Sequence, residues 1–257
     1  MPTIITGASV TSEGIVTNTL GTSNFVAGVN AGNSITSGGN YNTVVGDEAG
    51  TAITTGDNNT AVGQDALKST TTADHNTAVG QAALYTNTTG TTNTAVGRAS
   101  MYANTTGGAN TAVGYAALNT NTTANNNTAV GYQSLQANTT GAGNVAVGRQ
   151  ALAVNTTASS NTALGDQALN VNTTGASNTA VGSAALASNT TASENTAVGL
   201  SAMISNTTGP ENTAVGKSAL LANTTGGDNA ALGNDALSAN TTGSHNVAIG
   251  DRALQTN

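Results

Sequence analysis

The chain has 257 residues, of which 32 are glycine, none is cysteine and only 7% are charged. A conventional globular enzyme has roughly 25% charged residues and a core of large side chains, whereas aromatic residues make up 2% of this chain. The net charge of −7, with only five lysines and arginines, argues against nucleic acid as a partner, because affinity for phosphates depends on cationic side chains. We therefore expect a protein that is not an enzyme and that has no cofactor and no metal.

Two kinds of targeting segment are not expected either. No stretch contains the 18 or so apolar residues of a membrane-spanning helix, so no membrane insertion is predicted. The first six residues, Met1 to Thr6, lack the basic and apolar regions of a secretory signal. A location outside a cell would then require another route of export.

The N-terminal segment 1–41 is atypical, and a repeat fills the remainder of the chain. Within this segment one degenerate copy of the repeat begins at Asn24 and runs one residue longer than the later copies. Because the ends of stacked repeats need protection, we expect segment 1–41 to cap the first coil or to attach it to a larger particle.

Residues 42–257 repeat the motif Asn-Thr-Ala-Val-Gly-x-x-Ala-Leu-x-x-Asn-Thr-Thr-Gly-x-x, with twelve complete copies over 42–245 and a partial one after them. We number the positions of the motif 1 to 17. Position 5 is always glycine, position 4 is always a branched aliphatic residue, and position 9 is leucine or methionine after the first copy. Charged residues are confined to positions 6, 7, 10, 16 and 17, which must therefore be the solvated corners.

A strict period of this length predicts a solenoid, because an apolar position repeated at fixed spacing is buried only if successive copies stack. Thr-Ala-Val alternates as a strand does, and the following glycine suits a sharp corner. The asparagines at positions 1 and 12 can satisfy turns or form amide ladders between coils. Positions 6–11 are compatible with a turn or a one-turn helix. The predicted fold is an all-β parallel solenoid, or β-roll, of 17-residue coils.

Positions 4 and 9 are the predicted core. Two large side chains in each coil stabilise it little in comparison with the entropy that the backbone of a whole coil loses on folding, so a single thin coil looks marginal. The small residues at positions 3, 8 and 11 would let a second and a third chain approach closely, and we expect a homotrimer with cyclic symmetry. The predicted core residues in the central copies are Val62, Leu67, Val79, Leu84, Val96, Val113, Leu118, Val130, Leu135, Val147 and Leu152.

The motif resembles the head repeat of YadA-type trimeric autotransporter adhesins, and residues 246–250, Asn-Val-Ala-Ile-Gly, are the nearest copy. That family forms a left-handed parallel β-roll, but its repeat is shorter, so the handedness of this chain stays open. Segments 32–38 and 52–56, followed by the array, also look like repeat regions of tailed-phage tail fibres. The resemblance implies a virion tail fibre or an extracellular surface protein, with a cell-surface glycan or protein receptor bound through a separate tip.

These observations lead to a structural function: the shaft or head of a tail fibre, which holds a receptor-binding tip away from the particle. A bacterial surface adhesin head is one alternative. The threonines at positions 13 and 14 raise another, an ice-binding protein, in which an outward row of threonines orders water. Only one of two successive strand residues can face outward.

Four tyrosines are candidate glycan contacts: Tyr85 and Tyr102 share position 10, and Tyr115 and Tyr132 share position 6 of the next two copies. Aromatic packing between coils would also explain them.

The remaining candidate site residues have simpler explanations. The histidines His75 and His245 are expected in exposed loops, and the neighbouring carboxylates Asp57 and Asp74 are expected to be solvated, as are Asp47 and Glu48. The Asn-Thr-Thr segment gives ten glycosylation sequons that repetition of a turn already explains, at Asn87, Asn104, Asn121, Asn138, Asn155, Asn172, Asn189, Asn206, Asn223 and Asn240.

Overall fold

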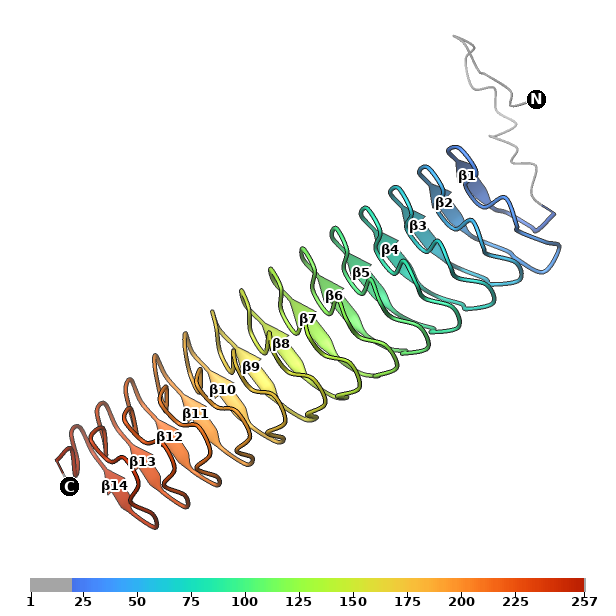
Figure 1. Ribbon diagram of the computed structural model, residues 1–257. Helices are drawn as coiled ribbons and strands as arrows, with labels where there is room; N and C mark the ends of the chain where they lie inside the picture. The colour runs from blue at the N-terminus through green and yellow to red at the C-terminus, as the bar shows by residue number, and fades with distance from the viewer. Residues whose placement is uncertain (1–19, 257) are drawn as a thin grey trace, which may run out of the picture.

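The computed structural model describes residues 20–256, which form one parallel β-solenoid (Figure 1). Fourteen short strands lie side by side in one sheet in the order of the sequence, and the described range contains no helix, hence none that could span a membrane. The all-β solenoid predicted from the repeat is confirmed. The strands are β1 Phe25–Ala27, β2 Thr43–Val45, β3 Thr60–Val62, β4 Thr77–Val79, β5 Thr94–Val96, β6 Thr111–Val113, β7 Thr128–Val130, β8 Val145–Val147, β9 Thr162–Leu164, β10 Thr179–Val181, β11 Thr196–Val198, β12 Thr213–Val215, β13 Ala230–Leu232 and β14 Val247–Ile249.

The register of the sheet places each repeat position on its own copy in the next coil. Thr128 of β7 pairs with Val145 of β8, Ala129 with Ala146 and Val130 with Val147. The degenerate copy joins the same sheet despite its extra residue, since Phe25 of β1 pairs with Thr43 of β2. Residues 1–19 of the segment expected to cap the solenoid lie outside the described range, and the cap itself stays a prediction.

Each strand has three residues because the glycine at position 5 ends it. Gly131 has a φ of +131°, and a Cβ atom on it would lie 2.5 Å from the carbonyl oxygen of Gly148 in the next coil. Any other residue would both strain the backbone and collide with the neighbouring coil. The invariant glycine is therefore a requirement of coil stacking.

Positions 6–11 form consecutive turns, so the one-turn helix that we considered for this segment is wrong and the turn is right. The residues at positions 7 and 9 have left-handed backbone conformations, as in Gln133 with φ 53° and Leu135 with φ 49°. The backbone forms turn bonds within the coil, from Ser134 N to Gly131 O at 3.4 Å, and shorter bonds to the next coil, from Leu135 N to Ala151 O at 2.9 Å. These bonds between coils offset the cost of left-handed non-glycine residues.

The core lies inside each single coil and consists of positions 3, 8 and 9. In the coil of β7, Ala129, Ser134 and Leu135 are all 0% exposed. The predicted core leucines are confirmed, because all of them are completely buried: Leu67, Leu84, Leu118, Leu135 and Leu152.

The valines of the predicted core do not lie in it. Because strand side chains alternate in direction and the alanine at position 3 points inward, positions 2 and 4 point outward. Between the alanine and the leucine the coil has no room for a second branched side chain, which is why the inward strand residue is so small. The half-buried or exposed valines are Val62, Val79, Val96, Val113, Val130 and Val147.

The small residues expected to let other chains approach are also differently placed. At positions 3 and 8, alanines such as Ala61 and Ala66 are 0% exposed inside their own coil, so they cannot contact another chain. Of the three positions only position 11 reaches the surface, where Ala137 is half-buried. The proposed trimer therefore needs a different contact surface.

Replacement of Leu135 by alanine should lower the free energy of unfolding by about 2–5 kcal/mol, because it leaves a cavity in a core with no other large side chain in that coil. The adjacent surface variant Gln136→Ala is the matched control and should change it by no more than about 0.5 kcal/mol. Chemical denaturation followed by circular dichroism measures both. Equal effects would show that position 9 is not the core.

Candidate interaction surface

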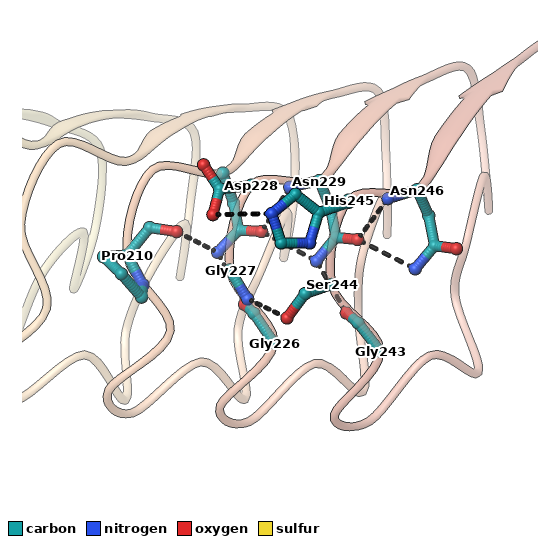
Figure 2. Close-up of polar contacts among 10 residues, drawn as sticks. Pro210, Gly226, Gly227, Asp228, Asn229, Gly243, Ser244, His245 and Asn246 are labelled. Carbon is teal, nitrogen blue, oxygen red and sulfur yellow. Dashed lines mark hydrogen bonds and ion pairs between the residues drawn. The ribbon is translucent and has the colours of Figure 1, made fainter.

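Buried asparagines connect the coils along two lines. At position 1, Asn127 Oδ1 accepts hydrogen bonds from the backbone N–H of Asn144 at 2.9 Å and from its Nδ2 at 3.2 Å, while Asn127 Nδ2 donates to Gly141 O at 2.9 Å. Figure 2 shows the same arrangement near the C-terminal end of the array, where Asn229 Oδ1 accepts from both nitrogens of Asn246. Each amide thus satisfies buried polar groups in its own coil and the next.

The asparagines at position 12 form the second line, and these are the sequon residues. Asn138 Nδ2 donates to Asn121 Oδ1 at 3.0 Å and to Gly141 O at 2.9 Å. The ten sequon asparagines are between 0% and 5% exposed. Their amide nitrogens are hydrogen bonded inside the coil, so attachment of a glycan would require the coil to open. The repeated turn accounts for the sequons.

The outward side of the sheet is a regular surface that runs along the described chain from β2 to β14. We call it the Thr/Val face and define it as positions 2 and 4 of strands β2 to β14. Its residues are threonine, valine, leucine, isoleucine and alanine, and none is charged. Within residues 20–256 the threonine hydroxyls at position 2, such as that of Thr128, form no intramolecular hydrogen bond. The face therefore presents one row of free hydroxyls beside one row of aliphatic side chains.

The threonines at positions 13 and 14 differ from one another as the alternation argument predicted. Thr139 at position 13 is half-buried, and its Oγ1 donates to Thr156 O of the next coil at 3.0 Å. Thr140 at position 14 is exposed. The row considered for ice binding is thus a single line of threonines on a bend, beside hydroxyls that are already bonded to the backbone.

The four tyrosines form two stacked pairs. The rings of Tyr85 and Tyr102 are 4.9 Å apart with an angle of 6° between their planes, and those of Tyr115 and Tyr132 are 5.4 Å and 12° apart. Lys68 Nζ lies 5.5 Å from the Tyr85 ring, on which it forms a cation–π contact. Each ring covers one face of its partner, and the cations lie over Tyr85 and Tyr115, the first ring of each stack. Packing between coils explains these tyrosines, and a glycan contact stays a prediction.

The second stack also carries a cation, and it belongs to a longer polar row at position 6. Arg98 lies 5.7 Å from the Tyr115 ring, and its Nε donates to Gln81 Oε1 at 3.1 Å. Further along the row, Arg149 Nε pairs with Asp166 Oδ1 at 2.9 Å. The charges of Arg149 and Asp166 thus neutralise one another between coils.

The carboxylates near the N-terminal end are engaged in local contacts. Asp57 Oδ1 accepts from the backbone N–H of Asn40 at 2.6 Å, and Asp74 Oδ1 accepts from that of Asp57 at 2.7 Å. Lys68 Nζ pairs with Asp65 Oδ1 at 2.8 Å and with Glu48. These two acidic partners raise the pKa of Lys68 above its ordinary value. Asp47, beside Glu48, is exposed as expected.

Neither histidine has a partner set suited to a metal. His75 is exposed, and His245 Nε2 lies 3.7 Å from Asp228 Oδ2 at the surface (Figure 2). No group of three or more histidine, aspartate or glutamate side chains within the described range could hold a metal ion. The uncharged Thr/Val face is therefore the candidate interaction surface.

Reasoning from the sequence placed the aliphatic residues at position 4 of this face inside the protein. A signal for its true direction was available, because position 3 is alanine in every copy after the first. Position 3 stays small while its neighbours at positions 2 and 4 vary in size. This indicates that the side chain at position 3 points to the side of the strand that has less space.

No protein-family model matches this chain, and neither curated proteins nor solved structures give a significant match.

Lys68 should react more slowly than Lys217 with an amine-acylating reagent at pH 9. The raised pKa of Lys68 leaves less of it as free amine at that pH, whereas Lys217 is exposed. Peptide mapping after brief labelling measures the ratio. The double variant Glu48→Gln, Asp65→Asn should bring the rate at Lys68 close to that at Lys217, and an unchanged rate would contradict the role of the two carboxylates.

Proposed function

We propose that this chain is the shaft or head of a homotrimeric fibre that holds a receptor-binding tip away from a particle. The observation that carries this proposal is the unbroken register of fourteen strands, in which the parallel strand pairing recurs from each coil to the next. Such an array suits a rigid spacer.

The bonding between coils supports a mechanical role. A bend or a shear between the coils of β7 and β8 would have to break the strand pairing, the bond from Leu135 N to Ala151 O and both asparagine lines at once. Thirteen steps between fourteen strands, at about 4.8 Å each, give a rod roughly 62 Å long. Resistance to bending over that length is what a spacer requires.

The place and partners proposed for the protein follow from this role. A virion tail fibre or an extracellular surface is where a spacer of this kind would act, and its first partner is a second and third copy of itself. A glycan or protein receptor would be bound by a tip outside the repeat. Stacking between coils covers one face of each tyrosine on the shaft, so any glycan contact through Tyr102 or Tyr132 would be secondary to binding by the tip.

Ice binding is a second candidate, because one observation favours it. The hydroxyls at position 2 are regularly spaced, exposed in part and free of intramolecular hydrogen bonds, and they lie on a rigid sheet beside a row of methyl groups. A bacterial adhesin head would share the architecture of the fibre proposal and would differ in the flanking gene segments, which would encode a stalk and a membrane anchor.

Light scattering on the purified chain should give three times the mass of one chain, which is 24.8 kDa, because the fibre is a trimer. Small-angle X-ray scattering should give a rod about 62 Å long over the repeats, and the repeats should survive protease treatment under native conditions. A particle with the mass of a single chain would contradict the trimeric fibre. Thermal hysteresis in that monomeric sample would favour ice binding instead.

A further inference from the structure

We infer that the Thr/Val face is the surface through which three copies of this chain assemble, parallel and in register around a threefold axis. This inference rests on the proposed trimer and names its contact. The small residues at positions 3 and 8, which we first expected at the contact between chains, are buried inside each coil. We therefore assign the contact to the outward side of the sheet.

The first argument is the exposure of a continuous apolar row. Position 4 is branched aliphatic in every coil, and its larger members are substantially exposed in the single chain: Leu164 by 46%, Leu232 by 49% and Ile249 by 70%. An isolated exposed valine needs no explanation. An unbroken row along the whole sheet does, because extended apolar surfaces of soluble proteins mark interfaces.

The distribution of charge gives the second argument. Every charged side chain of the repeat array lies at positions 6, 7, 10, 16 or 17, and positions 2 and 4 of β2 to β14 carry none. Three copies meeting through this face would bury no charge and would leave the charged corners in water, since the cost of burying unpaired charges is large. The core of a stable interface is depleted in charge in the same way.

The area of the face is adequate for a stable contact. A three-residue strand is about 10 Å long, and the sheet extends over about 62 Å, so the face covers roughly 600 Å² before flanking residues are counted. A stable interface buries about 800 Å² on each partner. The face of each chain therefore supplies most of that value.

Irregularities along the face favour a copy of the chain over a layer of ordered water. Position 2 is valine in β8 and β14 and alanine in β13, and position 4 changes to leucine or isoleucine in β9, β13 and β14. Ordered water on a flat surface requires constant spacing and height. A copy related by a threefold axis lies at the same height along the rod, so each irregular coil meets the same coil of its neighbours.

The free hydroxyls at position 2 fit the same arrangement. A threonine hydroxyl can donate one hydrogen bond and accept others. At a threefold contact the hydroxyl of Thr128 can therefore bond to a polar group at the same height in a neighbouring copy. This would satisfy groups that have no partner in the single chain, without any charged side chain.

A single charge on the face tests the inference. Val130→Asp places one carboxylate from each copy beside the axis, and the control Thr140→Asp places the same charge on the exposed bend of the same coil. By light scattering we expect the wild type and Thr140→Asp to have three times the mass of one chain, and Val130→Asp to fall toward the mass of one chain. Circular dichroism reports whether each variant retains its β-structure.

Single cysteines test the register independently of stability, because the chain has no cysteine of its own. Thr60→Cys and Thr196→Cys lie in β3 and β11, toward opposite ends of the sheet. Parallel copies in register should be cross-linked by a short bismaleimide within each variant alone, whereas antiparallel copies should be cross-linked only when the two variants are mixed. Thr89→Cys, on the exposed bend, should give no cross-link.

The outcomes separate this inference from the proposed function. A wild-type trimer that persists in Val130→Asp, or one whose Thr60→Cys variant is not cross-linked alone, would overturn the contact and leave the fibre standing. A monomeric wild type would overturn both. Thermal hysteresis that Val130→Asp abolishes in that monomer would assign the face to ice. Loss of the trimer in Val130→Asp, with self-cross-linking at both Thr60→Cys and Thr196→Cys, would establish the contact even if Val130→Asp unfolds.

Discussion

The constraint on which this structure depends is that successive coils have the same number of residues. Because all coils from Asn42 onward are equally long, each backbone group finds its counterpart in the next coil at the same place, as when Thr128 N donates to Asn144 O at 2.8 Å and Gly131 N to Val113 O at 2.8 Å. One inserted residue within a coil would displace every later bond of that turn. The extra residue of the first coil is tolerated beside β1, at the end of the array.

The narrow interior follows from the same constraint. With two buried alanines and one leucine in most coils, the chain must fold back sharply, and it does so through left-handed residues that are not glycine, such as Gln133 and Leu135. Each costs of the order of 1–2 kcal/mol. Leu135 stabilises its conformation by complete burial and by a hydrogen bond to the next coil, so stacking, rather than local preference, determines the turn. An isolated repeat would have neither contribution.

Much of this fold could be predicted from the sequence, because a strict period specifies stacking before any element is assigned. The strand, the glycine corner, the asparagine lines and the buried Leu67 and Leu152 all follow from the repeat. The direction of Val62 could not be read from hydrophobicity, since alanine and valine both suit an interior and only the available space decides between them. The conformation of positions 6–11 depends on bonds to the next coil, which local propensities do not contain. The tyrosine stacks could be predicted because the two rings of each pair share a repeat position. The cation–π contacts of Lys68 and Arg98 could not, because they depend on how far each side chain extends toward the ring.

The corrected core changes the reason for expecting three chains. The argument from the sequence was that one coil buries too little to be stable alone, yet the single coil already has a dry interior of Ala129, Ser134 and Leu135 and saturated asparagines. The small core of a single coil is therefore the weaker reason for expecting three chains to assemble. The stronger one is the row of aliphatic side chains that the interior has no room for, from Val45 to Ile249, which the sheet turns toward solvent. A branched aliphatic residue at an outward position in every coil favours contact with an apolar partner, and a second chain with the same spacing would match it at every level.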